Sequence, residues 1–205
     1  MSPDSNLHVL VLAAGAASRF GSPKQLARIG GVMMLQKAVS QATEVAGHAV
    51  TVVLGAHAER IVPLLRQSPA TVEINRQWQE GLASSLRLGI SRLPAGCEGV
   101  LVTLADQVAI SSFDLRRLVA AWRRQPEWLI AASYDGHTGV PAIFPAWCFA
   151  DLGALRGDTG ARAVLTRYAD RCLRLPMPNA GVDIDTPEDL LGLQDTDPGE
   201  PKSGK

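Results

Sequence analysis

The sequence predicts an α/β fold of three layers, in which helices cover both faces of a mostly parallel mixed sheet. An unbroken apolar run at residues 9–12 and two largely apolar runs at 49–54 and 99–105 are typical of strands buried on both faces. Stretches with helical periodicity, such as residues 32–45, lie between them. An Asp135-Gly136 turn joins two later apolar runs and predicts a hairpin, so part of the sheet is antiparallel.

Length and charge limit the organisation and the partners of the chain. With 205 residues and 46% hydrophobic content, the chain can build one well-buried core, so residues 1–194 are expected to form a single domain. Residues 195–205 are rich in Asp, Pro, Gly, Ser and Lys and are expected to be a disordered tail. The 20 acidic and 20 basic residues cancel, which disfavours nucleic acid and anionic membranes as partners.

Cysteine usage and hydropathy favour a cytoplasmic protein. Cys97, Cys148 and Cys172 are odd in number and lack C-x-x-C spacing, so we expect reduced thiols without a metal or a catalytic role. The apolar run at residues 7–17 has no Lys or Arg before it, unlike a signal peptide. No later apolar segment is long enough to cross a bilayer.

The first apolar run ends in a loop of very small residues, and this loop predicts a phosphate site. Small side chains allow a phosphate chain to approach main-chain N–H groups, and Arg19 and Lys24 follow closely enough to neutralise its charge. Two common phosphate loops are excluded. Phe20-Gly21 stands where a Walker A loop has Gly-Lys, and Ala17 stands where a dinucleotide fingerprint has its second Gly. An ordinary strand-to-helix turn is the alternative.

The next elements follow from apolar periodicity and from breakers. Gly47 ends the first helix, and residues 49–54 form the next strand. Residues 58–65 predict a short helix that begins late or bends at Pro63. A third strand is expected at 71–74, followed by a helix that runs to Leu93 with Ser84 or Ser85 as its N-cap.

Asp106 directly follows the buried run at residues 99–105. The carboxyl ends of strands are where open α/β sheets bind ligands, and Mg²⁺ is usually held by one or two carboxylates together with phosphate oxygens. We therefore expect Asp106 to bind Mg²⁺. A helix cap or a turn is the alternative role, but Ser111 or Ser112 is a better cap for the helix that follows to Gln125.

Strands are expected at residues 129–134 and 139–144, and Pro141 suggests that the second of these lies at a sheet edge or enters the sheet there. Asp158 is expected to cap a helix that ends at Tyr168. Arg162 would lie in the first turn of this helix, where a cation is unfavourable unless a ligand anion is near.

A last strand is expected at residues 172–175, and an acidic segment follows it. Thr186 as N-cap, with Asp189 three residues later, resembles a capping box. Asp183 and Asp185 would share one face if they lie in a strand, and two adjacent carboxylates repel each other unless a cation is close.

Five motifs, in order between residues 9 and 190, resemble a known family. L-A-A-G-x-x-S-R-F-G-x-x-K is similar to the opening motif of GT-A-like nucleotidyltransferases, and is most similar to that of the molybdenum cofactor cytidylyltransferase family. N-x-x-W-x-x-G-x-x-S-S-L, the Asp106-Gln107 pair, G-x-P-x-x-F and G-D-x-G-A-R follow. The resemblance implies a Rossmann-like, GT-A-type fold.

The resemblance also implies roles for individual residues. The nucleotide-binding set would be Leu12, Ala13, Ala14, Gly15, Arg19, Lys24, Asn75, Gly81 and Ser85. The acceptor-binding set would be Gln107, Gly139, Pro141 and Arg162. The metal ligands for Mg²⁺ would be Asp106, Asp183 and Asp185. Arg19, Lys24 and Asp106 would carry catalysis.

The implied reaction transfers CMP from CTP to molybdopterin-bound molybdenum cofactor and releases pyrophosphate, with a molybdoenzyme as a possible partner. Guanylyltransferase relatives have L-A-G-G where this chain has Ala14, which favours CTP. Val108 stands where the family has Pro, so the loop after Asp106 has one more N–H to satisfy and is expected to differ from the family's loop beside the acceptor. A guanylyltransferase, a sugar-phosphate nucleotidyltransferase and a non-catalytic carrier of the cofactor are the alternatives.

Overall fold

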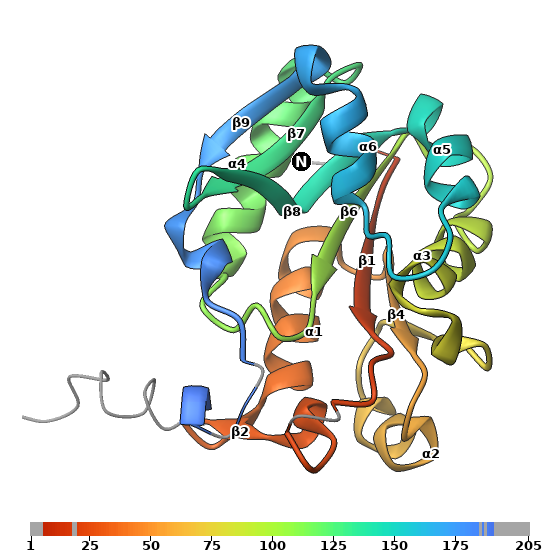
Figure 1. Cartoon of the computed structure of the whole chain (residues 1–205), viewed down its shortest axis with the longest axis vertical. Helices are drawn as coiled ribbons and strands as arrows, with labels where there is room; N and C mark the ends of the chain where they lie inside the picture. Colours follow the sequence, from red (N-terminus) through yellow and green to blue (C-terminus); the bar gives the residue numbers. More distant parts are fainter. Residues whose placement is uncertain (1–5, 18–19, 185, 187, 191–205) are drawn as a thin grey trace, which may run out of the picture.

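A seven-stranded mixed sheet forms the centre of the molecule (Figure 1). The computed structural model describes residues 6–17, 20–184, 186 and 188–190. Only β8 runs antiparallel to its neighbours β6 and β7, and the other described pairs in this sheet are parallel. The strands, in order across the sheet, are β5 (Thr71–Ile74), β4 (Val50–Leu54), β1 (Leu7–Ala13), β6 (Gly99–Leu104), β8 (His137–Pro145), β7 (Leu129–Tyr134) and β9 (Cys172–Pro176).

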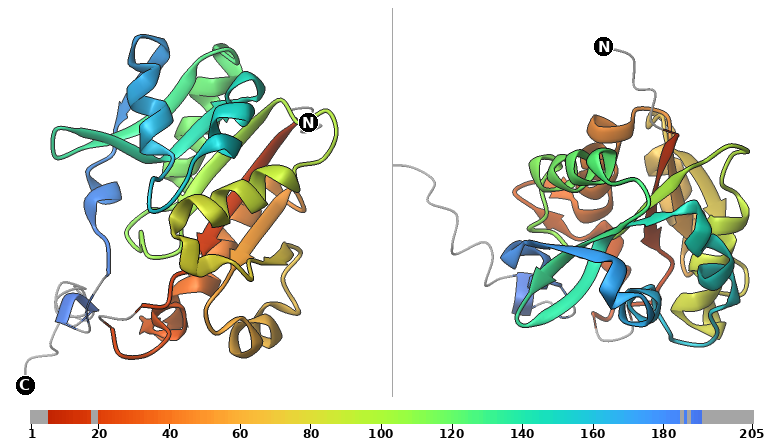
Figure 2. Two further views of the ribbon diagram at one scale, coloured as in Figure 1. Left: turned by 45° about the vertical axis from the view of Figure 1, so that its right-hand side comes forward. Right: turned by 90° about the horizontal axis from the view of Figure 1, so that it is seen from above.

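Helices cover both faces of this sheet, which confirms the predicted three-layer α/β fold (Figure 2). One face packs against α1 (Met34–Ala46), α2 (Ala58–Ile61) and α4 (Ser112–Arg124). The other face packs against α3 (Leu82–Ser91), α5 (Phe149–Ala154) and α6 (Arg162–Arg167). The short strands β2 (Arg28–Ile29) and β3 (Val32–Met33) form a separate ribbon. The 3₁₀ turns are η1 (Lys24–Leu26), η2 (Val62–Leu65), η3 (Trp78–Glu80), η4 (Ala146–Cys148), η5 (Ala169–Arg171) and η6 (Pro178–Gly181).

The unbroken apolar run in β1 follows from its central place in the sheet. Val9 and Val11 enter the core on one face, and Leu10 and Leu12 enter the core on the other. Successive side chains of a strand point to opposite faces, so a strand covered on both sides needs apolar residues at most of its positions. This burial fixes where β1 ends, because the chain leaves the core at the loop after Ala13.

Two predicted helix caps are wrong. The N-cap of α3 is Gly81, and Ser84 and Ser85 lie inside the helix with their hydroxyls bonded to Asn75. The helix α6 begins at Arg162 with Ala161 as its N-cap, so Asp158 does not cap it. The predicted cap of α4 is confirmed, since Ser111 forms a capping box with Asp114.

Pro141 does not mark an edge strand. The strand β8 lies between β6 and β7 in the interior of the sheet. Ala131 pairs with Ala142 but Ala132 pairs with Gly139, so Pro141 lies in a bulge where the register shifts. A bulge tolerates a residue without an N–H, which is why an interior strand can contain this proline.

The segment before the C-terminal end forms no strand in its described part, residues 182–184, so the predicted shared face of Asp183 and Asp185 is not supported by a strand there. Asp185 and the predicted tail, residues 195–205, lie outside the described residues. Thr186 and Asp189 exchange the two hydrogen bonds of a capping box, as the spacing predicted. None of the helices in the described part of the chain is long and apolar enough to cross a bilayer.

Candidate active site

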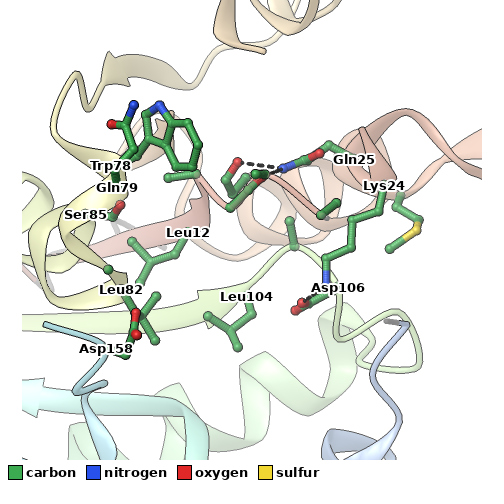
Figure 3. Close-up of a pocket in the computed structure, with 18 residues that line it drawn as sticks. Leu12, Lys24, Gln25, Trp78, Gln79, Leu82, Ser85, Leu104, Asp106 and Asp158 are labelled. Atoms are coloured by element: carbon green, nitrogen blue, oxygen red, sulfur yellow. Dashed lines mark hydrogen bonds and ion pairs between the residues drawn. The ribbon is translucent and has the colours of Figure 1, made fainter. Parts of the chain in front are cut away.

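A pocket of about 540 Å³ opens at the carboxyl ends of β1 and β6 (Figure 3). Lys24 and Asp106 lie on one side of it, and Trp78, Ser85 and Asp158 lie on the other. This is the edge at which parallel α/β sheets bind ligands. The lining residues are Leu12, Ala13, Ala14, Gly15, Ala16, Ala17, Lys24, Gln25, Met34, Trp78, Gln79, Gly81, Leu82, Ser85, Leu104, Ala105, Asp106 and Asp158.

The loop after β1 is held in place by Gln25. The buried side chain of Gln25 donates from Nε2 to the carbonyl oxygens of Ala13, at 3.1 Å, and Gly15, at 2.8 Å. These two carbonyls are therefore engaged by a donor and repel an anion in the pocket less than free carbonyls would. Arg19, which the sequence assigns to this loop, lies outside the described residues.

Lys24 and Asp106 form an ion pair on one side of the pocket. The ammonium of Lys24 donates to Asp106 Oδ2 at 2.6 Å and to the carbonyl oxygen of Ile184 at 3.0 Å. Both side chains are largely covered, with 16% and 22% of their surface exposed. The second carboxylate oxygen, Asp106 Oδ1, is buried and has no hydrogen-bond partner among the described residues. An unpartnered buried carboxylate oxygen is costly, so this atom is suited to a cation that arrives with a ligand.

The opposite wall consists of η3 and the first turns of α3. Asn75 lies behind this wall and does not line the pocket, because its Nδ2 donates to Ser84 Oγ at 2.7 Å and to Ser85 Oγ at 2.9 Å. Its Oδ1 accepts from the backbone N–H of Gln77. Asn75 therefore holds the Trp78–Ser85 wall in position, while Ser85 itself faces the pocket.

Gly81 is required by close packing as well as by its backbone. Its φ is +99°, a region that favours glycine. A Cβ at this position would collide with Asp158 Oδ1 and would lie 2.6 Å from the backbone of Gly157. The 157–160 loop thus packs directly on Gly81 and brings the Asp158 carboxylate into the pocket wall.

The residues that the sequence assigns to an acceptor lie beside the pocket and do not line it. Gln107 is buried and donates from Nε2 to the carbonyl oxygens of Val140, at 2.8 Å, and Ala180, at 2.9 Å. It therefore ties the loop after β6 to the bulge of β8 and to η6. Gly139 lies under Tyr134, whose hydroxyl would be 2.5 Å from a Cβ at position 139.

Arg162 and Tyr134 extend this second region toward Asp183. Arg162 is hydrogen-bonded to His137 Nδ1 at 3.1 Å, on the exposed side of the molecule. Burial, and then the negative charge of Asp183, raise the pKa of Tyr134, while the charge of Arg162 opposes this shift. Tyr134 is therefore a neutral phenol at physiological pH, within the electrostatic reach of both charged groups.

The two described aspartates that the sequence assigns to a metal lie on adjoining segments. The N–H of Ile184 donates to the backbone oxygen of Asp106 at 3.3 Å, which places Asp183 on the segment next to the Asp106 loop. No cluster of three or more His, Cys, Asp or Glu side chains suited to a metal occurs among the residues that the structure describes. A metal here would need oxygens from a ligand as well as from the protein.

Sequence reasoning did not assign Gln25, Trp78, Asp158 or Tyr134 to the site. Trp78 and Asp158 stand inside quoted motifs, so their positions were visible, but nothing in the spacing indicated that both line one pocket. Gln25 follows Lys24 directly, and its partners in the 13–15 loop are set by the turn at η1. Tyr134 lies on a strand and approaches Asp183 only through the fold.

Residues 9–172 match the family described as MobA-like NTP transferase domain. Among curated proteins, nicotine blue oxidoreductase of Paenarthrobacter nicotinovorans is 28% identical over 195 residues, which cover 90% of this chain and 94% of the relative. The bifunctional protein GlmU of Clavibacter sepedonicus is 29% identical over 94% of this chain. The chain spans only 39% of the length of that relative.

Solved structures share the fold. Rv0371c of Mycobacterium tuberculosis H37Rv superposes with a TM-score of 0.81 at 24% identity, over 94% of this chain and 99% of that one. Its structure in complex with manganese gives a TM-score of 0.74 at 23% identity, over the same shares of the two chains. These likenesses agree with the mixed sheet and the helical layers described above.

Proposed function

Because the chain belongs to the family of MobA-like NTP transferase domains, we propose that it transfers a nucleotidyl group from a nucleoside triphosphate to a phosphate-bearing acceptor and releases pyrophosphate. In its specific form, the proposal is transfer of CMP from CTP to molybdopterin-bound molybdenum cofactor. The observation that carries it is the pocket itself, which combines a small-residue loop, a lysine and a carboxylate at one end with an aromatic and polar wall at the other.

The phosphate end of the nucleotide would lie against residues 13–17 and Lys24. Their small side chains leave the backbone accessible, and an ammonium group neutralises phosphate charge. Arg19 would add a second cation, a role that rests on the motif alone. Because Lys24 is bound to Asp106 before the nucleotide arrives, it must exchange a carboxylate for phosphate oxygens when the triphosphate binds.

The donor set at Asp106 fits a divalent cation, which Asp106 would hold. Asp106 Oδ1 is buried without a partner in the described part of the chain, and carboxylate oxygen is the ligand that Mg²⁺ prefers. Asp183 is the proposed second ligand, with Asp185 as the alternative. Rv0371c, similar in fold, has been solved with manganese, which supports a divalent metal here. When bound, Mg²⁺ would neutralise charge on the phosphates and orient them.

The base would lie between the 13–17 loop and the wall that contains Trp78 and Ser85. Ala14 lines the pocket, and its Cβ faces Gly55, since a Cβ at position 55 would lie 2.9 Å from it. The preference for CTP over GTP therefore rests on the motif, in which guanylyltransferase relatives have Gly in place of Ala14.

The acceptor would approach from the region tied together by Gln107. Gly139 and Pro141 shape the bulge at this side, and Arg162 offers a cation for the acceptor's phosphate. An oxygen of that phosphate attacks the α-phosphorus, a new P–O bond forms, and the bond between the α-phosphorus and the bridging oxygen breaks. Pyrophosphate leaves with the bonding electrons. Since the attacking group is already an anion, the protein contributes alignment and charge neutralisation and needs no covalent nucleophile.

Two related functions share this chemistry, and a third does not. GTP could replace CTP, or a sugar phosphate could replace the cofactor as acceptor. A carrier that binds the cofactor without catalysis would have no use for a triphosphate pocket with a lysine and an aspartate. The name of the oxidoreductase relative belongs to that protein, and at 28% identity it does not define the activity of this chain.

A pyrophosphate-release assay distinguishes these functions. Purified protein is incubated with Mg²⁺ and each of the four ribonucleoside triphosphates, with molybdenum cofactor, with a panel of sugar phosphates or without an acceptor. Release that requires CTP and cofactor, and that is lost in Asp106→Ala, supports the specific proposal. Release of pyrophosphate with GTP, another nucleotide or only a sugar phosphate supports the related nucleotidyltransferase activities instead. No release in any combination, while the cofactor still binds, supports a carrier.

A further inference from the structure

The Asp158 carboxylate is a charged group in the pocket wall that the proposed reaction does not use. Asp158 lines the pocket beside Gly81 and Leu82, and its side chain is exposed. No hydrogen bond or ion pair joins this carboxylate to another residue in the described part of the chain. The carboxylate is therefore available to a ligand, and a carboxylate can only accept hydrogen bonds from it.

The loop that carries this carboxylate is fixed by its backbone contacts. The N–H of Ala83 donates to the carbonyl oxygen of Gly157 at 3.0 Å, which pins the 157–160 loop to the first turn of α3. A Cβ at Gly160 would touch Leu82 at 3.0 Å, so the loop lies closely against this wall. The absence of a side chain at Gly81 is what allows Asp158 to reach the pocket. An acceptor carried by a loop whose backbone is already ordered costs less conformational entropy when it binds a ligand.

Its place in the pocket indicates which part of a nucleotide it would meet. In Figure 3, Asp158 lies near Leu82 and Leu104, away from Lys24 and on the other side of Leu12 from Trp78. With phosphates at Lys24 and the base near Trp78 and Ser85, Asp158 lies on the base side of the pocket but apart from Trp78, so the sugar attached to the base would be nearer to it than the phosphates. A carboxylate repels phosphate oxygens but accepts hydrogen bonds from the 2′- and 3′-hydroxyls of ribose.

We propose that Asp158 accepts hydrogen bonds from the ribose hydroxyls and selects ribonucleotides over deoxyribonucleotides. This inference rests on the proposed function, because it assumes that a nucleoside triphosphate occupies the pocket. In this proposal the 157–160 loop contacts the nucleotide. The sequence motif that contains this loop had instead been connected with the acceptor, through Arg162. A site built to bond a hydroxyl rejects an analogue that lacks it, because the carboxylate then loses its partner.

The test is calorimetric titration without acceptor, so that no turnover occurs. Wild type is titrated with ATP, CTP, GTP and UTP in the presence of Mg²⁺, and the best ligand is compared with its 2′-deoxy and 3′-deoxy forms. Asp158→Ala is the test variant, with Asp158→Asn as the conservative form. Asp170→Ala, an exposed aspartate in η5 that does not line the pocket, is the matched control. Thermal unfolding of each variant checks that the fold is intact.

Wild type is expected to bind the ribonucleotide roughly 10-fold or more tightly than at least one deoxy form, as for a hydrogen bond to a charged group. Asp158→Ala should lose this preference, because its affinity for the ribonucleotide falls while its affinity for the deoxy form does not change. The preference of Asp158→Asn should lie between those of wild type and Asp158→Ala. Asp170→Ala should have the same preference as wild type. Retained discrimination in Asp158→Ala would overturn this inference but not the proposed function. A change confined to the choice between CTP and UTP would also overturn it, because the contact would then be to the base. Failure of wild type to bind any of the four triphosphates would overturn both.

Discussion

The ammonium group of Lys24 engages one of the two oxygens that Asp106 could offer to a metal. At 2.6 Å, with little exposure of either side chain, this ion pair is much less screened than a surface pair. The same ammonium is the cation that the motif assigns to the triphosphate. Lys24 and a divalent metal should therefore compete for Asp106 until a nucleotide draws the lysine away.

This competition predicts the behaviour of Lys24→Met. Without nucleotide, the variant should bind Mn²⁺ several-fold more tightly than wild type, because Asp106 is relieved of its competing cation. Its affinity for the triphosphate should fall at the same time. Electron paramagnetic resonance of free Mn²⁺ measures the first effect, and calorimetry measures the second.

Lys37→Met is the matched control, since Lys37 lies on α1 and does not line the pocket. It should leave both affinities unchanged. If Lys24→Met and wild type bound Mn²⁺ equally in the absence of nucleotide, the competition would not exist.

A second residue-scale prediction concerns Gly81. An alanine there would have to adopt a φ of +99° and would collide with Asp158 and Gly157, so Gly81→Ala should lower the free energy of unfolding by at least about 2 kcal/mol. Urea unfolding followed by circular dichroism measures this. Nucleotide affinity should fall too, because the 157–160 loop and the start of α3, which both line the pocket, pack together at this glycine.

Gly153→Ala is the comparison, since Gly153 lies in α5, has no positive φ, and would bring an added Cβ within 4 Å of no neighbouring element. That change should be neutral or slightly stabilising, because alanine favours a helix. A Gly81→Ala protein as stable as wild type would refute the packing described for this glycine.

At the scale of elements, local signals predicted the structure where local contacts decide it. The strands at residues 71–74 and 129–134 have the bounds that the sequence predicted, and Ser111 caps α4 as expected. Ser84 and Ser85 were misassigned because their true partner, Asn75, approaches from the neighbouring strand end. Pro141 was wrongly taken as a sign of an edge strand. The bulge that accommodates it depends on how β7 and β8 pair, and the sequence around Pro141 does not encode that pairing.

The capping box of α4 gives an element-scale prediction. Ser111 accepts from the N–H of Asp114, and the Asp114 carboxylate accepts from the N–H of Ser111. Ser111→Ala should cost about 1 kcal/mol of stability, as for typical caps. Ser112→Ala, one residue later and inside the helix, should cost little or nothing. Equal values for the two variants in urea unfolding would contradict the cap.

At the scale of the molecule, the central pair of parallel strands contains a buried titratable group. His8 on β1 is hydrogen-bonded to Thr51 on β4 at 2.9 Å, and burial lowers the pKa of His8 below its ordinary 6.5. The unfolded chain therefore binds a proton at a higher pH than the folded chain. The contribution of neutral His8 to the free energy of unfolding is therefore fully present above pH 6.5. It is lost as the pH falls through the lowered pKa of His8 in the folded state.

We expect the free energy of unfolding to decline below pH 6.5, with a contribution from His8 of up to about 1.4 kcal/mol per pH unit. Urea unfolding at several pH values between 7.5 and 5 measures the slope. His8→Gln keeps a hydrogen-bonding group but does not titrate, so its slope should be shallower. Identical slopes for wild type and His8→Gln would show that His8 does not titrate differently in the folded and unfolded states.

Individual residues of the site could be predicted from the sequence, but the contacts between them could not. The loop after β1, Lys24 and Asp106 could be singled out because small residues, a cation and a strand-end carboxylate each indicate phosphate or metal chemistry. That Lys24 binds Asp106, 82 positions away, depends on how β1 and β6 are paired. The contribution of Asp158 depends on the packing of two loops around Gly81, which no local pattern encodes.

The fate of the α-phosphorus of CTP tests the proposed nucleotidyl transfer most directly. Wild type, Asp106→Asn and the control Asp170→Asn are incubated with Mg²⁺, molybdenum cofactor and CTP labelled with ³²P at either the α- or the γ-position. Wild type and Asp170→Asn should move the α-label to the cofactor and the γ-label to pyrophosphate in equal amounts, and Asp106→Asn should do neither. Transfer of the γ-label to the cofactor, or α-label transfer undiminished in Asp106→Asn, would contradict the account.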